Sequence, residues 1–444
     1  MTDPLTFPSG FRWGAATAAY QIEGAVAEDG RVPSVWDTFT AVPGNVMHGD
    51  SAAVAADHYR RYREDVALMA ELGLTTYRFS VSWARVTGGG LDFYERLVDE
   101  LLAHGIEPML TLYHWDHPQT LQDLGGWSIR DMPQWYADYA ARVATVLGDR
   151  VPLWMTLNEP WCTAFLGHAS GVHAPGVADG RTALTVAHHL NLAHGLGVQA
   201  LRSILPSTAQ VGIALNPAPV RSTSDDAARR ADALRNRLFL DPLLLAEYPA
   251  DLIADTVHLT DWSFVQDDDL KVVAQPVDLL GVNYYTPLVV AEGPGPRDAY
   301  NPWVGSEDLL HVPAAGSDAG IHGAVDATGL YDLLMRLRRD YPPVPVVIAE
   351  NGAAFPDEVR PDGTIDDPRR IAYLRAHLTE LNRAITGGAD VRGYVMWSLM
   401  DNFEWAYGYS QRFGLVHVDF ADQRRTIKNS GRWYREVIAT NTVR

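Results

Sequence analysis

The sequence predicts an α/β fold: a single (β/α)8 barrel, or TIM barrel, that spans residues 1–444 as one domain with elaborated βα loops. Two observations support this prediction. Short apolar runs alternate with longer amphipathic runs along the whole chain, and eight of each are present. No linker rich in Ser, Gly or Pro divides the chain, and barrels of this type exceed about 400 residues when their loops carry insertions.

Eight apolar runs have the character of strands that are buried on both faces. Runs of four to eight residues that are rich in β-branched side chains and end near Pro or Gly are typical of parallel strands. The predicted strands are residues 11–18, 75–81, 107–113, 152–159, 210–216, 277–285, 344–350 and 391–399.

The longer runs repeat apolar residues with helical spacing. Several also carry residues that begin or end helices: Asp131 and Pro133 stand at one start, and Gly73 and Gly105 follow two ends. The predicted helices are residues 52–72, 93–104, 133–147, 182–203, 225–240, 330–339, 368–386 and 430–440. A strand followed by a helix, repeated eight times, is the order of a (β/α)8 barrel.

The alternative fold is an open, doubly wound sheet. A sheet of that kind that binds a dinucleotide or phosphate carries a Gly-rich turn after its first strand. Gly24 follows the first predicted strand alone, and neither a GxGxxG nor a GxxxxGK(S/T) pattern occurs, so the barrel is preferred. Residues 290–329, rich in Gly, Pro and Asp, are expected to form a long loop on the face where the strands end.

Composition argues against several classes of partner. The formal net charge of −19 argues against a nucleic acid or an anionic membrane, because both attract clustered Lys and Arg. Cys162 is the only cysteine, so no internal disulfide can form, and its apolar setting indicates a buried structural thiol. No window approaches the ~20 apolar residues of a membrane span. The first residues lack the features of a signal peptide, so a cytoplasmic location is expected.

Polar residues follow the predicted strands at the ends that converge in a barrel. Glu159 ends the fourth predicted strand and Glu350 ends the seventh, so the core would hold both carboxylates rigidly. The polar and aromatic residues at or near these ends are Gln21, Arg78, His114, Asn158, Glu159, Asn283, Tyr285, Glu350, Trp397, Glu404 and Trp405. They show no metal-binding spacing, so we expect neither a metal nor another cofactor.

Carboxylates, neutral hydrogen-bond donors and aromatic side chains together suit a neutral, hydroxyl-rich ligand. Two carboxylates also suit cleavage of a glycosidic bond, which needs one protonated carboxylic acid and one ionised carboxylate. Arg78 and Tyr285 would keep Glu350 ionised, because an opposite charge and a hydrogen bond to the charged form both lower a carboxylate pKa. Glu159, on a Trp-lined loop, would be the desolvated and protonated partner.

Four motifs resemble those of family 1 of the glycoside hydrolases, the β-glucosidase family, in the same order over nearly the whole chain. They are residues 7–24, residues 156–160 (TLNEP), residues 348–352 (IAENG) and residues 402–405 (NFEW). The resemblance implies a retaining β-glucosidase-type hydrolase. Glu350 would attack the anomeric carbon and Glu159 would act as acid and then as base, with their carboxyl groups about 5–5.5 Å apart.

The resemblance also assigns residues to the sugar. It implies that Trp397 lies under the sugar ring and that Asn283 and Tyr285 line the nucleophile, with Arg78 in support. The residues that would hold the hydroxyls of the non-reducing sugar are Gln21, His114, Asn158, Glu404 and Trp405.

The implied substrate is a small β-glycoside or oligosaccharide with an unphosphorylated terminal β-D-glucosyl group, or the related galactosyl or fucosyl group. Members that act on 6-phosphosugars resemble one another in having Ser, Lys and Tyr where this chain has Glu404, Gln411 and Phe413. Two departures concern the site: Ala349 stands where Thr is usual, and the loop at residues 87–90 is short. A transglycosylase with the same residues and a non-catalytic sugar-binding module remain as alternatives.

Overall fold

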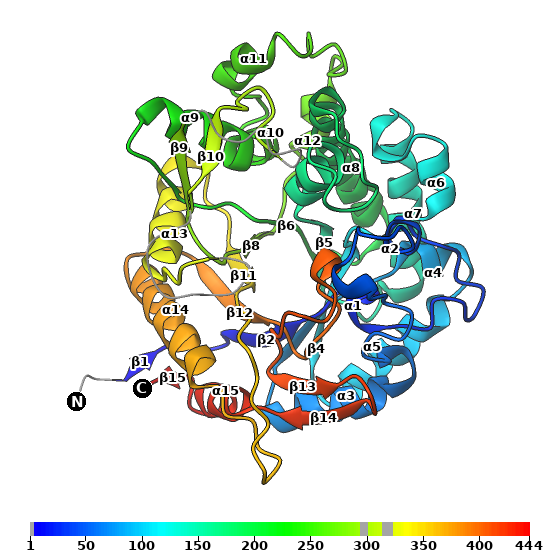
Figure 1. Ribbon diagram of the computed structural model, residues 1–444, viewed down its shortest axis with the longest axis vertical. Helices are drawn as coiled ribbons and strands as arrows, with labels where there is room; N and C mark the ends of the chain where they lie inside the picture. Colours follow the sequence, from blue (N-terminus) through cyan, green and yellow to red (C-terminus); the bar gives the residue numbers. More distant parts are fainter. Residues whose placement is uncertain (1–3, 294–300, 313–322) are drawn as a thin grey trace.

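Eight parallel strands close into a barrel in the computed structural model, which describes residues 4–293, 301–312 and 323–444. They follow one another around the barrel in chain order, and the last strand closes against the first (Figure 1). They are β2 (Arg12–Ala16), β3 (Thr76–Ser80), β4 (Glu107–Tyr113), β5 (Leu153–Asn158), β6 (Gln210–Leu215), β8 (Leu279–Asn283), β11 (Val346–Glu350) and β12 (Val391–Trp397). The predicted fold class is confirmed, and each predicted strand overlaps one of these eight.

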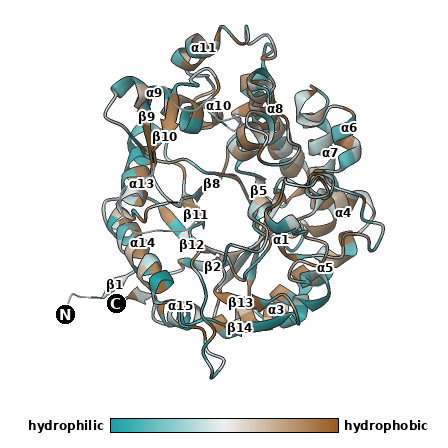
Figure 2. Ribbon diagram, in the orientation of Figure 1, coloured by the Kyte–Doolittle hydropathy of each residue, from teal (hydrophilic) through white to brown (hydrophobic). Residues whose placement is uncertain are grey.

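An outer ring of amphipathic helices covers the barrel (Figure 1). In α5 (Leu91–Ala103) the buried residues Phe93, Leu97 and Leu101 recur with helical spacing, so one apolar stripe faces the strands. Hydrophilic residues lie on the outer faces of such helices (Figure 2). The other main ring helices are α3 (His58–Leu72), α7 (Met132–Leu147), α8 (Gly180–Ile204), α10 (Leu238–Leu244), α13 (Thr328–Asp340), α14 (Pro368–Thr386) and α15 (Asn429–Thr440).

Shorter helices lie in the loops between the barrel elements. They are α1 (Ala19–Ile22), α2 (Val35–Thr40), η1 (Met47–Gly49), α4 (Trp83–Thr87), α6 (Gln119–Asp123), η2 (Gly126–Ser128), η3 (Cys162–Leu166), α9 (Asp225–Asp232), η4 (Ala233–Arg237), α11 (Ala250–Thr256), α12 (Asp269–Val273) and η6 (Trp405–Tyr407). Many of them follow the carboxyl ends of strands, so they build the rim of the barrel on that side.

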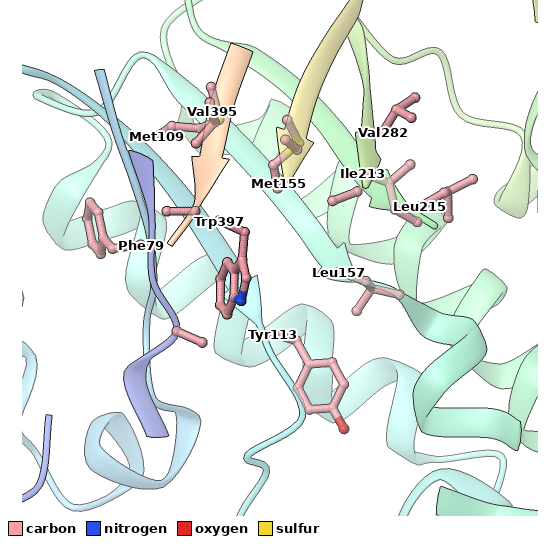
Figure 3. Close-up of a cluster of buried hydrophobic side chains, with 14 of the residues drawn as sticks. Phe79, Met109, Tyr113, Met155, Leu157, Ile213, Leu215, Val282, Val395 and Trp397 are labelled. Carbon is pink, nitrogen blue, oxygen red and sulfur yellow. The ribbon is translucent and has the colours of Figure 1, made fainter. Parts of the chain in front are cut away.

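Apolar side chains from several strands fill the core. Met109, Met155, Ile213, Val282 and Val395 come from β4, β5, β6, β8 and β12, and each is at most 1% exposed (Figure 3). Close packing of this kind fixes the strand ends from which the polar side chains emerge.

Three predicted segments differ from the structure, and two of them are helices. The predicted helix at 52–72 begins only at His58, because Ala55 and Asp57 have φ of 49° and 50°, in the left-handed region. The predicted helix at 225–240 is confirmed as α9 and α10, but the π-helical turn η4 joins them.

The third segment, at 290–329, is more ordered than the loop that its composition predicts. At its start β9 (Leu288–Glu292) pairs with β10 (Leu309–His311), and β7 (Val220–Arg221), from an earlier part of the chain, pairs with β9 to complete a small sheet. Residues 294–300 and 313–322 of this segment lie outside the described residues.

The two ends of the described chain meet at one side of the barrel (Figure 1). There β1 (Leu5–Thr6) pairs with β15 (Thr442–Val443), and the hairpin of β13 (Val416–Asp419) and β14 (Arg424–Ile427) precedes the last helix. Within the described ranges, no helix has the length and apolar character needed to cross a membrane.

Candidate active site

A cavity of about 440 Å³ opens at the carboxyl ends of the barrel strands. Seven of the residues predicted from the strand ends line it: His114, Glu159, Tyr285, Glu350, Trp397, Glu404 and Trp405. The others, Gln21, Arg78, Asn158 and Asn283, are buried directly behind them and hydrogen-bond to them. The barrel therefore gathers all eleven predicted residues around one cavity.

Glu350 lies at the end of β11 and is held by two side chains. Arg78 Nη1 donates to Glu350 Oε1 at 2.6 Å, and the Tyr285 hydroxyl donates to Oε2 at 2.7 Å. Arg78 Nη1 also donates to the carbonyl oxygen of Ala349 at 3.0 Å. That contact uses the backbone, so the departure at Ala349 leaves it intact. The two predicted contacts of Glu350 are confirmed.

The predicted direction of the Glu350 pKa is wrong. Burial raises the pKa of Glu350 to about 7; Arg78 opposes this shift, the charge of Glu159 adds to it, and the Tyr285 hydrogen bond opposes it. Desolvation of the buried carboxylate therefore raises the pKa of Glu350 more than the charge of Arg78 lowers it.

Glu159 follows β5 with φ of 43°, an uncommon backbone conformation for a residue with a side chain. The strand pairing shifts register just before it, between Met155 and Asn158, and such irregularities re-aim side chains next to active sites. Asn283 Nδ2 donates to Glu159 Oε1 at 2.7 Å. Asn283 is also the register partner of Glu350 in the pairing of β8 with β11.

The sequence did not predict two hydrogen bonds to Glu159. The Cys162 thiol and Asn216 Nδ2 both donate to Glu159 Oε2, each at 3.0 Å. Cys162 is buried as expected, and burial raises the pKa of its thiol, so a neutral S–H faces the carboxylate. Asn216 directly follows β6, so the rule that strand-end residues converge could have found it.

A chain of hydrogen bonds links the two glutamates behind the cavity. Asn158 Oδ1 accepts from Arg78 Nη2 at 2.6 Å and from Asn283 Nδ2 at 3.0 Å. Asn158 Nδ2 lies 3.0 Å from His114 Nε2. Burial, and then the charge of Arg78, lower the pKa of His114 well below its ordinary value, so its imidazole is neutral. Because Nε2 then accepts from Asn158, Nδ1 carries the proton.

Gln21 and Glu404 form the polar floor of the cavity. Gln21 Nε2 donates to Asn402 Oδ1, to the carbonyl oxygen of Phe403 and to Glu404 Oε2, at 3.0, 2.9 and 3.3 Å. Gln21 Oε1 is buried without a partner among the described residues, so it is free to accept a hydrogen bond. Burial, and then the charge of Glu350, raise the pKa of Glu404 to about 8.

Aromatic rings form the walls. The ring of His114 lies 5.9 Å from Trp397 and 5.8 Å from Trp405, nearly parallel to both. Trp115, which the sequence analysis did not select, lies 4.6 Å from Trp405 and donates from Nε1 to the carbonyl oxygen of Asn158 at 2.9 Å. Flat apolar walls beside fixed polar groups suit the faces and hydroxyls of a sugar ring.

One cluster in the described part of the chain has the residue types of a metal site: Asp357, Asp401 and His417. Lys428 Nζ lies 2.6 Å from Asp357 Oδ2 and 2.8 Å from Asp401 Oδ1. The ammonium group therefore supplies the positive charge that these carboxylates need. Asp401 immediately precedes the loop that bears Glu404, so the cluster anchors that loop.

Known proteins match the chain from end to end. The sequence model of Glycosyl hydrolase family 1 matches residues 4–443. Beta-glucosidase A of Acetivibrio thermocellus is 46% identical over 450 residues, which cover 98% of this chain and 99% of the relative. The bifunctional beta-D-glucosidase/beta-D-fucosidase of Bifidobacterium breve is 46% identical over 460 residues, which cover 99% and 100%.

Solved structures agree. A psychrophilic β-glucosidase from Micrococcus antarcticus has a TM-score of 0.94 at 46% identity, covering 99% of this chain and 98% of that one. The β-glucosidase from Thermotoga maritima in complex with cyclophellitol has a TM-score of 0.93 at 39% identity, covering 99% and 100%. Because the family's sequence model and these relatives span the whole barrel and its site, this chain belongs to glycosyl hydrolase family 1.

Proposed function

We propose that the chain is a retaining β-glucosidase. It hydrolyses terminal, non-reducing, unphosphorylated β-D-glucosyl groups by double displacement, with Glu350 as nucleophile and Glu159 as acid/base. The observation that carries the proposal is that both carboxylates line one cavity, with the Arg78 guanidinium in contact with Glu350. Arg78 favours the ionised, nucleophilic form of Glu350.

In the first step an oxygen of Glu350 attacks the anomeric carbon. The bond from that carbon to the glycosidic oxygen breaks, and the departing oxygen takes the proton of Glu159. In the second step Glu159 takes a proton from water, the water oxygen attacks the anomeric carbon, and Glu350 leaves as a carboxylate. This route requires the carboxyl groups to stand about 5–5.5 Å apart.

The sugar is held by the residues around the cavity. Trp397 lies under the ring, and Arg78, Asn283 and Tyr285 orient the two glutamates. Gln21, His114, Asn158, Glu404 and Trp405 bind its hydroxyls. The free Oε1 of Gln21 and the protonated Nδ1 of His114 supply one acceptor and one donor for this purpose.

The inner site favours a neutral sugar. Glu404 offers no positive charge to a phosphate, so 6-phosphosugars are excluded. The Bifidobacterium relative, named for glucosidase and fucosidase activities, supports a β-fucosyl group as a further substrate. We also infer that residues 1–444 form one catalytic domain and that the protein works in the cytoplasm.

The test compares Glu350→Gln with Glu358→Gln on a nitrophenyl β-glucoside. Glu350→Gln should lower kcat by more than about a thousandfold, because the covalent route disappears. Glu358 is exposed a few residues along the same loop, so its variant controls for the substitution itself. Wild-type turnover by purified Glu350→Gln would overturn the assignment.

Glu159→Ala tests the second role. It should slow substrates with poor leaving groups far more than activated aryl glucosides, because activated aglycones need little protonation. Equal losses on both would contradict an acid role. Transfer of the sugar to an added alcohol in preference to water would favour the transglycosylase, and binding without turnover would favour the sugar-binding module.

A further inference from the structure

The thiol of Cys162 is fixed beside Glu159 by the turn that follows β5. The backbone N–H of Cys162 donates to the carbonyl oxygen of Glu159 at 2.9 Å, and the π-helical turn η3 begins at Cys162. Cys162 Sγ then lies 3.0 Å from Glu159 Oε2, and Cys162 also lines the cavity. Irregular helical turns of this kind are frequent at functional sites.

Asn216, which directly follows β6, reaches the same two side chains. Its Nδ2 donates to Glu159 Oε2 at 3.0 Å and to Cys162 Sγ at 3.4 Å. Oε2 of Glu159 therefore accepts from a thiol and an amide, while Oε1 accepts from Asn283. Glu159, Cys162 and Asn216 are each at most 7% exposed, so little water competes for these contacts.

The hydrogen bonds to Glu159 favour its carboxylate form. A carboxylate accepts at both oxygens, whereas a protonated carboxyl group uses one of its oxygens to donate. Burial, and then the charge of Glu159, raise the pKa of the Cys162 thiol well above its ordinary value, so the S–H group keeps its proton. A hydrogen bond that is stronger to the charged form makes a carboxylic acid a stronger proton donor.

Other titratable groups also act on Glu159. Glu350 and Glu404 act on it with negative charge, and Arg235 acts on it with positive charge. The titratable groups of the lining that stay uncharged, because burial raises the pKa of the phenol and lowers the pKa of each imidazole, are Tyr285, His114 and His173. Replacing Cys162 removes none of these groups, so the effect of the thiol can be measured by itself.

We propose that Cys162 is a positioning residue for the acid/base: its thiol orients the Glu159 carboxyl group and stabilises the carboxylate that forms when the proton leaves. In the first step the proton passes from Glu159 to the departing glycosidic oxygen. The hydrogen bond from the thiol strengthens as negative charge develops on the carboxyl group, and the thiol keeps its own proton throughout. This inference rests on the proposed function, because it assumes that Glu159 is the acid.

The test compares Cys162→Ala with Cys162→Ser, which keeps a donor, on phenyl and 2,4-dinitrophenyl β-D-glucosides. The phenolate needs protonation to leave, and the dinitrophenolate does not. The ratio of kcat/KM on the phenyl substrate to kcat/KM on the dinitrophenyl substrate is independent of the amount of folded enzyme. Cys162→Ala should lower this ratio by about threefold, and Cys162→Ser should retain most of it.

The pH dependence of kcat/KM on the phenyl glucoside is the second readout. Without the thiol donor Glu159 holds its proton more tightly, so the basic limb in Cys162→Ala should move to higher pH by about half a unit. Asn216→Ala removes the other donor to Oε2 and should change both readouts in the same direction.

Leu166→Ala is the matched control. Leu166 lies at the other end of η3 and also lines the cavity, but its side chain cannot donate a hydrogen bond. This variant should leave the basic limb at its wild-type position, whatever its effect on KM.

A wild-type ratio or a wild-type basic limb in Cys162→Ala would overturn the proposal. An equal loss on both substrates is one such result, and Cys162 would then only support the fold of the turn. Equal losses on both substrates in Glu159→Ala would instead refute the acid role of Glu159, so the failure of this inference and the failure of the proposed function are distinguishable.

Discussion

Replacing Arg78 with methionine removes the cation that contacts Glu350 and keeps a side chain of similar reach. Both partners are nearly fully buried, with side-chain exposures of 2% and 4%, and their atoms lie 2.6 Å apart. Removing one partner of a buried pair costs about 3–5 kcal/mol when the other stays charged. The pKa of Glu350 is already about 7, so the carboxylate can avoid much of this cost by taking up a proton.

The cost should therefore appear as a further rise in the pKa of Glu350. One pKa unit corresponds to about 1.4 kcal/mol, so 3 kcal/mol corresponds to roughly two units. The nucleophile must be ionised, so a higher pKa moves the acid limb of the kcat/KM profile to higher pH by about two units. The assay is kcat/KM on a nitrophenyl β-glucoside between about pH 4 and 9.

Two variants control this experiment. Arg78→Lys keeps the charge and should leave the acid limb near its wild-type position. Arg85→Met breaks another buried pair, in which Arg85 Nε lies 3.0 Å from Glu23 Oε2. It should lower the thermal unfolding midpoint without moving the limb. An acid limb in Arg78→Met that coincides with that of the wild type would refute the reasoning.

Two further predictions concern the support of the cavity. In Gly352→Ala the new Cβ would lie 1.8 Å from the carbonyl oxygen of Trp397, so we expect a loss of about 1–3 kcal/mol in the free energy of unfolding and a raised KM. Although burial opposes it, Lys428 and its neighbours hold the pKa of Asp401 well below its ordinary value, so Asp401→Asn should lower the thermal unfolding midpoint at pH 7. The difference from wild type should shrink as the pH falls below about 4, because the stabilisation from a lowered folded-state pKa is complete above the unfolded-state pKa and is lost as the pH falls toward the folded-state pKa. Asp390→Asn, at an exposed pair with Arg392, is the control and should have little effect.

The strands were predictable because burial on both faces leaves a continuous apolar signature. The prediction for β4 matches the observed strand at both ends, and α14 is likewise matched. The start of α3 was not predictable, since the left-handed residues Ala55 and Asp57 carry no local signal that excludes a helix. The strands β9 and β10 were not predicted because they depend on a non-local sheet, in which β9 pairs with β10 on one side and with the distant β7 on the other.

The residues of the candidate site likewise fall into those that the sequence predicted and those that it did not. Residues at strand ends were found because the carboxyl ends of barrel strands must converge, and Glu159 and Glu350 are both among them. The hydrogen bond from Cys162 to Glu159 was not predicted, because it forms only when the turn after β5 brings the two side chains together. Trp115 lies on a loop, where periodicity carries no information about the direction of a side chain.

By itself the sequence determined the order of strands and helices, the closed barrel that this order favours, and the pair of glutamates at its mouth. These follow from local apolar spacing and from the geometry common to all parallel barrels. Only the tertiary structure decided that burial raises the pKa of Glu350 in spite of its contact with Arg78. Desolvation and charge pairing depend on every atom that packs around a group, and those atoms come from segments far apart along the chain.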